Sequence, residues 1–230
     1  MMRSSSIKAG PDHVDFKEVL APTPFQDRVD SYSLTQDWAS WNGYKTAKTY
    51  DTLASEYFAI RSTCGVMDLT PMEKYRVGGP DALHFLNRLV TRDISGLQPN
   101  RVTYVVWCND EGKVLDDGTI FSLGEGEYRL CAQHHQLDWL LISSLGFDVT
   151  IEEETHSIAA LAVQGPTSYS VLSAAGIQEL NGLKPFGMIN ARVNGIECMV
   201  SRTGFTGDLG YEIWIDPSHA SAIWDAIFAL

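Results

Sequence analysis

The chain has 230 residues, 44% of them hydrophobic, and its 17 basic and 29 acidic side chains give a net charge of −12. Such a chain is long and apolar enough to bury a core as one large or two small domains, which excludes the disordered and fibrous classes of protein. The negative charge argues against nucleic acid or an anionic membrane as a partner, because few basic side chains are present to neutralise phosphate groups.

The N-terminal region contains no clear targeting signal. The stretch MMRSSSIKAGPDHVDFKEVL lacks an apolar segment and soon becomes acidic, so we expect no signal peptide. Residues 1–24 are polar, and we expect them to lie along the surface. No apolar run has the length of a membrane span. The cysteines show no CxxC spacing, which predicts free, buried thiols in a reducing, cytoplasmic compartment. They are Cys64, Cys108, Cys131 and Cys198.

Helices and short strands are interleaved through residues 51–153. DTLASEYFAIRS has Leu53, Tyr57 and Ile60 at helical spacing, which predicts a helix with one apolar face. Pro80 suits the first turn of a second helix, PDALHFLNRLV, and QLDWLLISSLG predicts a third. Short apolar runs predict strands in MEKYRVGG, VTYVVW, KVLDDGTIFSL, EYRLCAQ and FDVTIEE. Strands and helices that mix without regular alternation indicate an α+β domain.

A second α+β unit follows from residue 157. SIAALAVQGP predicts a strand that ends in a turn, and a helix is expected from Pro166 to Ala175. Asn194-Gly195, between alternating apolar residues, is a strong signal for a β-hairpin. After the strand YEIWID, the chain ends in an amphipathic helix capped by Asp216, with Ala220, Ile223, Trp224 and Ile227 on one face. Apolar side chains continue to the last residue, so we expect a further C-terminal domain or a partner that covers this helix.

Two adjacent aspartates, Asp116 and Asp117, lie inside the apolar run KVLDDGTIF. Successive side chains of a strand point to opposite faces, so one carboxylate is expected to be solvated and the other to face inward. Gly118 relaxes the strand and could mark a bulge beside a ligand. An inward aspartate in a cleft could act as a base or stabilise positive charge. The alternative is an edge strand that is protected by charged side chains.

The stretch SRTGFTGDLGYEIW (201–214) is the most distinctive part of the sequence. Its glycines allow tight turns and close approach to a ligand, but it lacks the GKS or GKT of a phosphate loop. The loop leads into a strand that places Glu212 between Tyr211 and Ile213. A carboxylate there is costly unless it is paired, and it matches a ligand edge with two adjacent N–H donors. The alternative is a glutamate on the solvent face of a half-exposed strand.

Other clusters carry weaker signals. His134 and His135 are adjacent, so their side chains diverge on a strand, and no third ligand has a suitable spacing. We therefore predict no metal site. The segment WASWNGYKTAKTYD (38–51) is interpreted as an aromatic loop that belongs either to the core or to the wall of a pocket.

Together these segments resemble the tetrahydrofolate-binding aminomethyltransferase family, typified by the T-protein of the glycine cleavage system. The resemblance rests on SRTGFTGDLGYEIW with RSTCGVMDLTPMEKYRVGGPDALHFLNRLVTRDI, YVVWCNDEGKVLDDGTIF, ALAVQGP and the last helix, which follow in the family's order. It implies an α+β fold of three domains arranged as a cloverleaf around a folate channel. Residues 1–65 with 155–230 would form the folate-binding first domain, and residues 66–154 an inserted, ferredoxin-like second domain. The family's C-terminal barrel has no counterpart in this sequence.

The resemblance also implies roles for individual residues. Asp117, the second aspartate of the pair, matches the family's catalytic aspartate, which implies that Asp117 is the one turned inward, toward a folate. Glu212 matches the glutamate that binds the amino and ring N–H edge of the pterin. The remaining implied folate contacts are Tyr104, Met72, Gln133, Phe205 and Tyr211, where Phe205 replaces the usual tyrosine and Gln133 the usual asparagine.

The implied function is a one-carbon transfer in which tetrahydrofolate is the co-substrate. Three departures from the family pattern concern the donor: Gly118 replaces a bulky aliphatic residue, NGYKTAKTYD follows Trp41, and TPM precedes the next strand. They lead us to expect a small methylated amine or sulfonium compound as the donor, as in a folate-dependent demethylase. The alternative is a T-protein proper, which acts on an aminomethyl-lipoyl carrier protein.

Two further alternatives belong to other functional classes. A non-enzymatic folate-binding relative is disfavoured, because residues 203–212 read TGFTGDLGYE and lack the hallmark Cys-Tyr-x-Gly-Gln-Glu. The substrate domain of a flavin-linked demethylating oxidase would accompany a dinucleotide-binding domain, and no GxGxxG occurs here.

Overall fold

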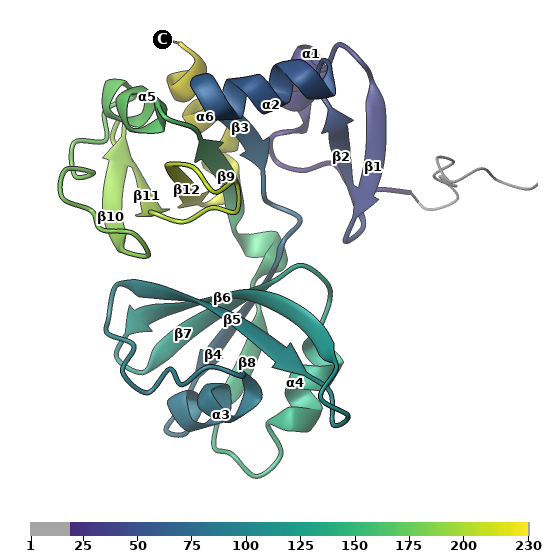
Figure 1. Ribbon diagram of the computed structural model, residues 1–230, viewed down its shortest axis with the longest axis vertical. Helices are drawn as coiled ribbons and strands as arrows, with labels where there is room; N and C mark the ends of the chain where they lie inside the picture. The colour runs from purple at the N-terminus through teal and green to yellow at the C-terminus, as the bar shows by residue number, and fades with distance from the viewer. Residues whose placement is uncertain (1–18, 230) are drawn as a thin grey trace, which may run out of the picture.

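Two five-stranded sheets organise residues 19–229, the part of the chain that this computed structural model describes (Figure 1). The sheets lie in two lobes, and the chain passes from the first lobe into the second and back again. Most of the N-terminal segment expected to lie along the surface, residues 1–18, falls outside the described residues. Among the described residues, no helix combines the length and the apolar character needed to cross a membrane.

The first sheet has the strand order β10-β11-β12-β9-β3, with antiparallel neighbours throughout. The predicted hairpin at Asn194-Gly195 is confirmed, because both residues have positive φ, 49° and 83°, as a two-residue hairpin turn requires. Side chains from three helices pack against one face of this sheet: α1 (Gln26–Tyr32), α5 (Ser168–Ala174) and α6 (Ala220–Phe228). The strands are β3 (Gly65–Asp68), β9 (Ala159–Gln164), β10 (Met188–Val193), β11 (Ile196–Ser201) and β12 (Gly210–Ile215).

The second sheet has the order β5-β6-β7-β4-β8, and helices α3 (Ala82–Leu89) and α4 (Leu137–Ser143) pack on one face. Strands β8-β4-β7-β6 and these helices have the ferredoxin-like βαββαβ arrangement, and β5 adds an edge strand. The predicted α+β class and ferredoxin-like unit are therefore confirmed. The strands are β4 (Glu73–Gly78), β5 (Arg101–Cys108), β6 (Val114–Gly124), β7 (Glu127–Ala132) and β8 (Thr150–Glu153).

A shared apolar cluster joins the two sheets. Phe121 of β6 packs edge-on against Trp214 of β12, with ring centroids 5.0 Å apart and ring planes at 74°. The backbone also connects the lobes, since the N–H of Val102 donates to the carbonyl of Phe186 at 2.8 Å. The buried members of the cluster are Leu69, Val102, Phe121, Cys131, Ala160, Ala162, Met188 and Trp214. One face of each sheet is therefore directed toward the other lobe.

Residues 38–51, interpreted from the sequence as a loop, instead belong to a hairpin of β1 (Asp37–Trp41) and β2 (Tyr44–Thr49). Its turn, Asn42-Gly43, has positive φ at both residues, 47° and 79°. This is the same turn chemistry as in the hairpin of β10 and β11. The loop interpretation is therefore wrong, and Trp38, Trp41 and Tyr44 lie on strands.

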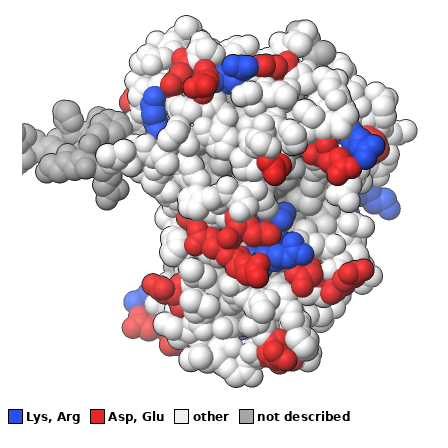
Figure 2. All heavy atoms as spheres, turned by 180° about the vertical axis from the view of Figure 1, so that it is seen from behind, with Lys and Arg blue, Asp and Glu red and all other residues white. Residues whose placement is uncertain are grey.

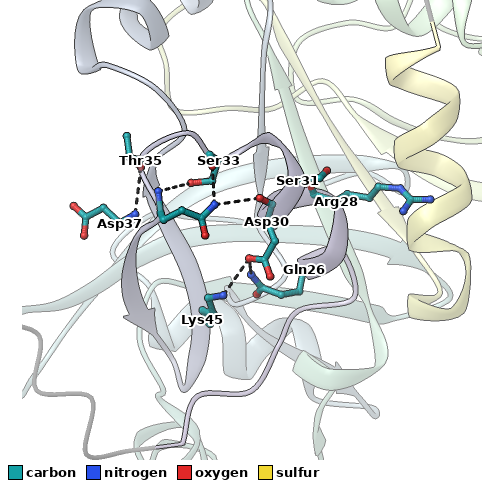
Figure 3. Close-up of polar contacts among 9 residues, drawn as sticks. Gln26, Arg28, Asp30, Ser31, Ser33, Thr35, Asp37 and Lys45 are labelled. Carbon is teal, nitrogen blue, oxygen red and sulfur yellow. Dashed lines mark hydrogen bonds and ion pairs between the residues drawn. The ribbon is translucent and has the colours of Figure 1, made fainter.

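Helix α1, which the sequence pattern did not predict, is tied to this hairpin by polar contacts (Figure 3). The carboxylate of Asp30 accepts hydrogen bonds from Lys45 of β2 at 3.1 Å and from Gln26 at 2.7 Å. The side-chain amide of Gln36 donates to the carbonyl of Ser33 at 2.7 Å and so closes the end of the helix. The hairpin is thereby held beside the first sheet.

Two other expectations differ from the structure. Helix α2 (Leu53–Ser62) forms where it was predicted but buries no residue, and Leu53 and Tyr57 are 77% and 54% exposed. Two residues of the predicted apolar face therefore lie mainly in solvent, whereas the third, Ile60, is half-buried. The domain boundary expected after residue 65 falls within β3, which pairs with β9 of the first sheet as far as Asp68.

The last helix, α6, buries the face that the sequence predicted. Ala220, Ile223, Trp224 and Ile227 pack into the core of the first lobe. Phe228 stacks on Trp224 with ring centroids 4.6 Å apart and remains 38% exposed. The core of the first lobe therefore covers one face of α6 and leaves Phe228 partly exposed, so the expected cover for the end of this helix stays a prediction.

Candidate functional site

Strand β12 places Glu212 on the face of the first sheet that is directed toward the second lobe. Alternation along the strand sends Tyr211 into the core beneath the helices and sends Glu212 and Trp214 to the opposite face. Glu212 is 7% exposed and lies opposite Ser201 of β11 and Ala162 of β9. The alternative of a solvent-facing glutamate is therefore wrong.

Two hydroxyl groups hold the Glu212 carboxylate. Thr203 Oγ1 donates to Glu212 Oε2 at 2.6 Å, and Ser201 Oγ donates to the same oxygen at 3.4 Å. Within residues 19–229, Oε1 of Glu212 accepts no hydrogen bond. Burial raises the pKa of Glu212, and the two hydroxyl donors lower it in part. A buried carboxylate that has one oxygen without a hydrogen-bond donor is suited to a ligand that supplies N–H donors.

Gln164, at the end of β9, packs so closely against the loop between β11 and β12 and the start of β12 that two positions there must be glycine. Its Nε2 donates to the carbonyls of Thr203 at 3.2 Å and Tyr211 at 3.1 Å, and so fastens both ends of the loop. A Cβ at Gly204 or Gly210 would lie 2.0 Å from Gln164 Oε1, so a larger residue would displace this side chain. Sequence reasoning treated QGP only as a turn and missed this residue. The available signal was a glutamine that ends an apolar strand.

A cavity of about 320 Å³ lies beside Phe205, which stands on the same loop and is 70% exposed. Met67 of β3 and Gln164 contribute to its walls. Met67 also shares the row of Glu212 across the sheet, since both residues pair with Ala162. Met67 therefore links the cavity to the face that carries Glu212.

The two aspartates of β6 face opposite sides of the second sheet. Asp116 is 6% exposed, and its carboxylate accepts hydrogen bonds from the backbone N–H groups of Asp117 and His134, each at 2.9 Å. Asp117 is exposed and accepts a hydrogen bond of 2.8 Å from the hydroxyl of Tyr104. The buried aspartate of the pair is therefore Asp116 and not Asp117, whereas the role of Asp117 toward a folate stays a prediction. Asp116 shares the face of Ile120, which packs beneath α3 and α4, whereas Asp117 lies on the opposite face.

The face that carries Asp117 is the one directed toward the first lobe. In the sheet register, Tyr104 lies opposite Thr119, and Thr119 lies opposite Cys131. Cys131 belongs to the apolar cluster between the lobes, and Met72 packs against the same cluster. Asp117, two residues before Thr119, points to the same side. Met72, Tyr104 and Asp117 therefore share one surface, and that surface faces the sheet of Glu212.

Two other predicted contacts are placed differently. Tyr211 is 2% exposed in the core of the first lobe, on the opposite side of β12 from Glu212, so the structure does not bring it to this surface. Gln133 follows β7 and is exposed, and its carbonyl accepts a hydrogen bond from Trp41 Nε1 at 3.2 Å. Gln133 thus lies where the β1–β2 hairpin meets the second lobe.

Gly118 is required by backbone packing. A Cβ at this position would lie 1.9 Å from the carbonyl oxygen of Cys131. The irregularity of the ladder is instead next to Cys108, which pairs with Val114. Since Gly118 lies on the same side of β6 as Asp116, its departure from the family pattern does not alter the surface that carries Asp117.

Comparison with known proteins identifies the family. A family model described as the GCVT N-terminal domain matches residues 8–230. The chain belongs to the tetrahydrofolate-binding aminomethyltransferase family. It is 34% identical over 215 residues to the aminomethyltransferase of Bacillus subtilis, a match that covers 91% of this chain and 58% of that protein. It is 36% identical over 194 residues to the aminomethyltransferase of Deinococcus deserti, covering 83% and 54% respectively.

The fold of this chain also resembles that of proteins with solved structures. Glycine cleavage system aminomethyltransferase T from Bartonella henselae superposes with a TM-score of 0.80 at 24% identity, covering 91% of this chain and 57% of that one. A chain of the heterotetrameric sarcosine oxidase from Corynebacterium shares the fold more distantly, with a TM-score of 0.53 at 13% identity. The chain spans between about half and three fifths of the length of the aminomethyltransferases that it matches.

Proposed function

We propose that this chain forms the folate-binding part of a tetrahydrofolate-dependent aminomethyltransferase. The observation that carries the proposal is the buried Glu212 carboxylate, which has one oxygen held by hydroxyl groups and faces the surface of Asp117 and Tyr104. The amino and ring N–H edge of a pterin offers the adjacent donors that this carboxylate lacks. The folate head group therefore fits because its N–H groups can donate hydrogen bonds to the buried carboxylate of Glu212.

In the proposed reaction, two nitrogens of the reduced folate form bonds to the methylene carbon of an aminomethyl thioether donor, while the bonds of that carbon to the amine nitrogen and to the sulfur break and ammonia and the thiol leave. Glu212 fixes the pterin edge, and this positioning can lower the barrier by several kcal/mol. The carboxylate of Asp117, oriented by Tyr104, stabilises positive charge on the donor nitrogen as its bond to the carbon breaks. Asp117 is open to solvent on this face, so it can also exchange a proton with a bound substrate.

The donor that we propose is the aminomethyl-lipoyl arm of a carrier protein. The named relatives are aminomethyltransferases, which favours this donor over the methylated amine or sulfonium compound expected from the sequence. Gly118, one of the three departures behind that expectation, faces away from the surface of Asp117. Its effect is on backbone packing, so it does not argue for a different donor.

The test is a calorimetric titration of tetrahydrofolate into the longest natural form of the protein. We expect saturable binding that is lost in Glu212→Ala. Glu197→Ala is the matched control, because Glu197 lies on the neighbouring strand β11, is exposed and pairs with Arg192. No binding by the parent protein, or equal loss in both variants, would contradict the proposal.

A further inference from the structure

Three potential metal ligands converge at one end of the second sheet, away from the proposed folate surface. Glu73 begins β4, His135 follows β7, and Glu153 ends β8. One ligand atom from each lies within 4.8 Å of the others. His135 Nε2 and Glu153 Oε2 are 3.5 Å apart. The sequence did not predict this group, because its members are far apart along the chain and meet only when β7, β4 and β8 pair.

Glu73 is the fixed member of the group. It is 4% exposed, and its Oε2 accepts hydrogen bonds from Thr155 Oγ1 at 2.9 Å and from Tyr75 Oη at 3.4 Å. Within residues 19–229, no Lys or Arg nitrogen lies within 4.0 Å of its carboxylate, and Oε1 accepts no hydrogen bond. A buried carboxylate without a cationic partner is costly, so this oxygen is suited to a cation.

The charges around Glu73, His135 and Glu153 also favour binding of a cation. Several acidic side chains of this lobe pair with arginine, as Glu127 does with Arg76 at 2.8 Å, and Figure 2 shows acidic side chains next to basic ones on the face in view. Among the described residues, neither Glu73 nor Glu153 has a Lys or Arg nitrogen within 4.0 Å, and Glu153 has His135 Nε2 at 3.5 Å. Negative charge is thus concentrated at this corner.

We propose that Glu73, His135 and Glu153 form a binding site for a divalent transition-metal ion, with Zn²⁺ the ion that fits best. Zn²⁺ binds imidazole nitrogen and carboxylate oxygen at about 2.0–2.2 Å, and three such ligands leave a fourth position for water. A mixed imidazole and carboxylate set disfavours Ca²⁺ and Mg²⁺, which prefer oxygen ligands alone. The side chains of His135 and Glu153 are 54% and 28% exposed, so they can close on an ion and leave a path for its entry.

The site is distinct from the proposed folate surface. Glu73 shares the face of Tyr75 and Val77, which pack beneath the helices, whereas Asp117 lies on the opposite face of the sheet. An ion at this corner would link β7, β4 and β8 and offset the charge of the two carboxylates. Its expected effect is therefore on the stability of the second lobe.

The test is binding of Zn²⁺ alone, and of Co²⁺ as a spectroscopic probe, to protein freed of metal with a chelator. We expect one equivalent to bind, with visible Co²⁺ bands of a four- or five-coordinate site and a raised midpoint of thermal unfolding. His135→Ala removes a ligand from an exposed position and is expected to weaken binding at least about tenfold. His134→Ala is the matched control, because His134 is the adjacent histidine and its ring lies beside Asp116 at 3.4 Å.

A second variant, Glu73→Gln, keeps the volume and the acceptor for Thr155 but removes the charge. We expect it to fold and to lose the Co²⁺ bands. Absence of saturable binding to the parent, an unchanged affinity in His135→Ala, or equal weakening in His134→Ala would each overturn the proposal. None of these outcomes depends on folate binding, so the proposed function is tested separately.

Discussion

Tyr104 of β5 donates a hydrogen bond of 2.8 Å to Asp117 Oδ2 on the neighbouring strand β6. The phenol holds one carboxylate oxygen in a fixed direction, and the other oxygen remains available on the surface that faces the first lobe. The same hydrogen bond raises the pKa of Tyr104, because it favours the protonated phenol beside a negative charge. The pair is therefore a preorganised acceptor for a cationic or protonated donor group.

Asp117→Asn is expected to lower turnover in the longest natural form of the protein by about 100-fold or more, since it removes the charge that stabilises the departing amine. The affinity for tetrahydrofolate is expected to change little, because Glu212 supplies the contact to the pterin edge. Steady-state kinetics and calorimetry measure the two effects separately. Equal loss of turnover and affinity would indicate a structural role for Asp117.

The adjacent aspartate provides the matched comparison. Asp116 accepts hydrogen bonds from two backbone N–H groups and is buried, so Asp116→Ala leaves both donors unpaired and is expected to cost about 1–3 kcal/mol of stability or more. Urea unfolding measures this cost. If Asp116→Ala were neutral for stability while Asp117→Asn unfolded the protein, the assignment of the two faces would be reversed.

Glu212 links pH to both binding and stability. Its folded-state pKa is raised above the ordinary value of 4.5, so the folded protein holds a proton that the unfolded chain has released. The free energy of unfolding therefore decreases as pH rises from the ordinary carboxyl pKa through the raised one. Glu212→Gln lacks this decrease and is expected to be more stable than the parent at neutral pH.

The same variant is expected to lose tetrahydrofolate binding, because an amide brings N–H groups of its own and no charge. In the parent, affinity is expected to fall as pH is lowered through the raised pKa, since the ligand's donors need the ionised carboxylate. Calorimetry in buffers of different ionisation enthalpy detects the released proton. A pH-independent affinity in the parent would mean that Glu212 does not contact the ligand.

Local signals account for the part of the fold that the sequence predicts well. Asn194-Gly195 specifies its hairpin because only residues that tolerate positive φ fit that turn. Asp216 accepts the N–H of Ser218 at 2.9 Å and so caps the 3-10 turn Pro217–His219, which leads directly into α6. Alternation also predicts that Asp116 and Asp117 diverge. These features depend on residues close together in the chain.

The remaining features depend on contacts between distant segments. Alternation cannot say whether Asp116 or Asp117 faces the helices, because that depends on which side of the sheet α3 and α4 cover. The hairpin at Asn42-Gly43 escaped prediction because both its strands are only partly buried, which blurs the apolar alternation. Glu73 and His135 likewise come close together only once β4 and β7 have paired in the sheet.

Substitution of Gly118 tests whether the close approach of β6 to β7 requires a glycine. A Cβ there would lie 1.9 Å from the backbone oxygen of Cys131, so Gly118→Ala forces the strands apart and is expected to cost about 3 kcal/mol or more. Gly96→Ala is the control, since a Cβ at Gly96 meets nothing within 4 Å, and it is expected to change stability by less than about 0.5 kcal/mol. Urea unfolding of both variants measures the difference, and equal stability would show that the strand spacing adjusts freely.

Lys74 gives the second lobe a distinct dependence on alkaline pH. The side chain is fully buried, and Nζ donates to the carbonyls of Thr70 at 2.8 Å and Met72 at 2.7 Å. Burial lowers the pKa of Lys74 from 10.5 to about 8. Between these two values the unfolded chain binds a proton that the folded protein does not, so the free energy of unfolding contributed by Lys74 increases with pH.

Lys74→Met isolates this contribution, because methionine fills a similar volume and does not titrate. Between pH 7 and pH 10.5 the parent is expected to gain stability relative to the variant, on the order of 3 kcal/mol, from the depressed pKa of Lys74. Burial raises the pKa of the neighbouring Cys131 to about 12, which lowers stability at alkaline pH, but this effect is present in both proteins and largely cancels. Urea unfolding at several pH values gives the difference directly. A constant difference across the range would mean that Lys74 keeps its proton in the folded state, and that the two carbonyls hold it as an ammonium group.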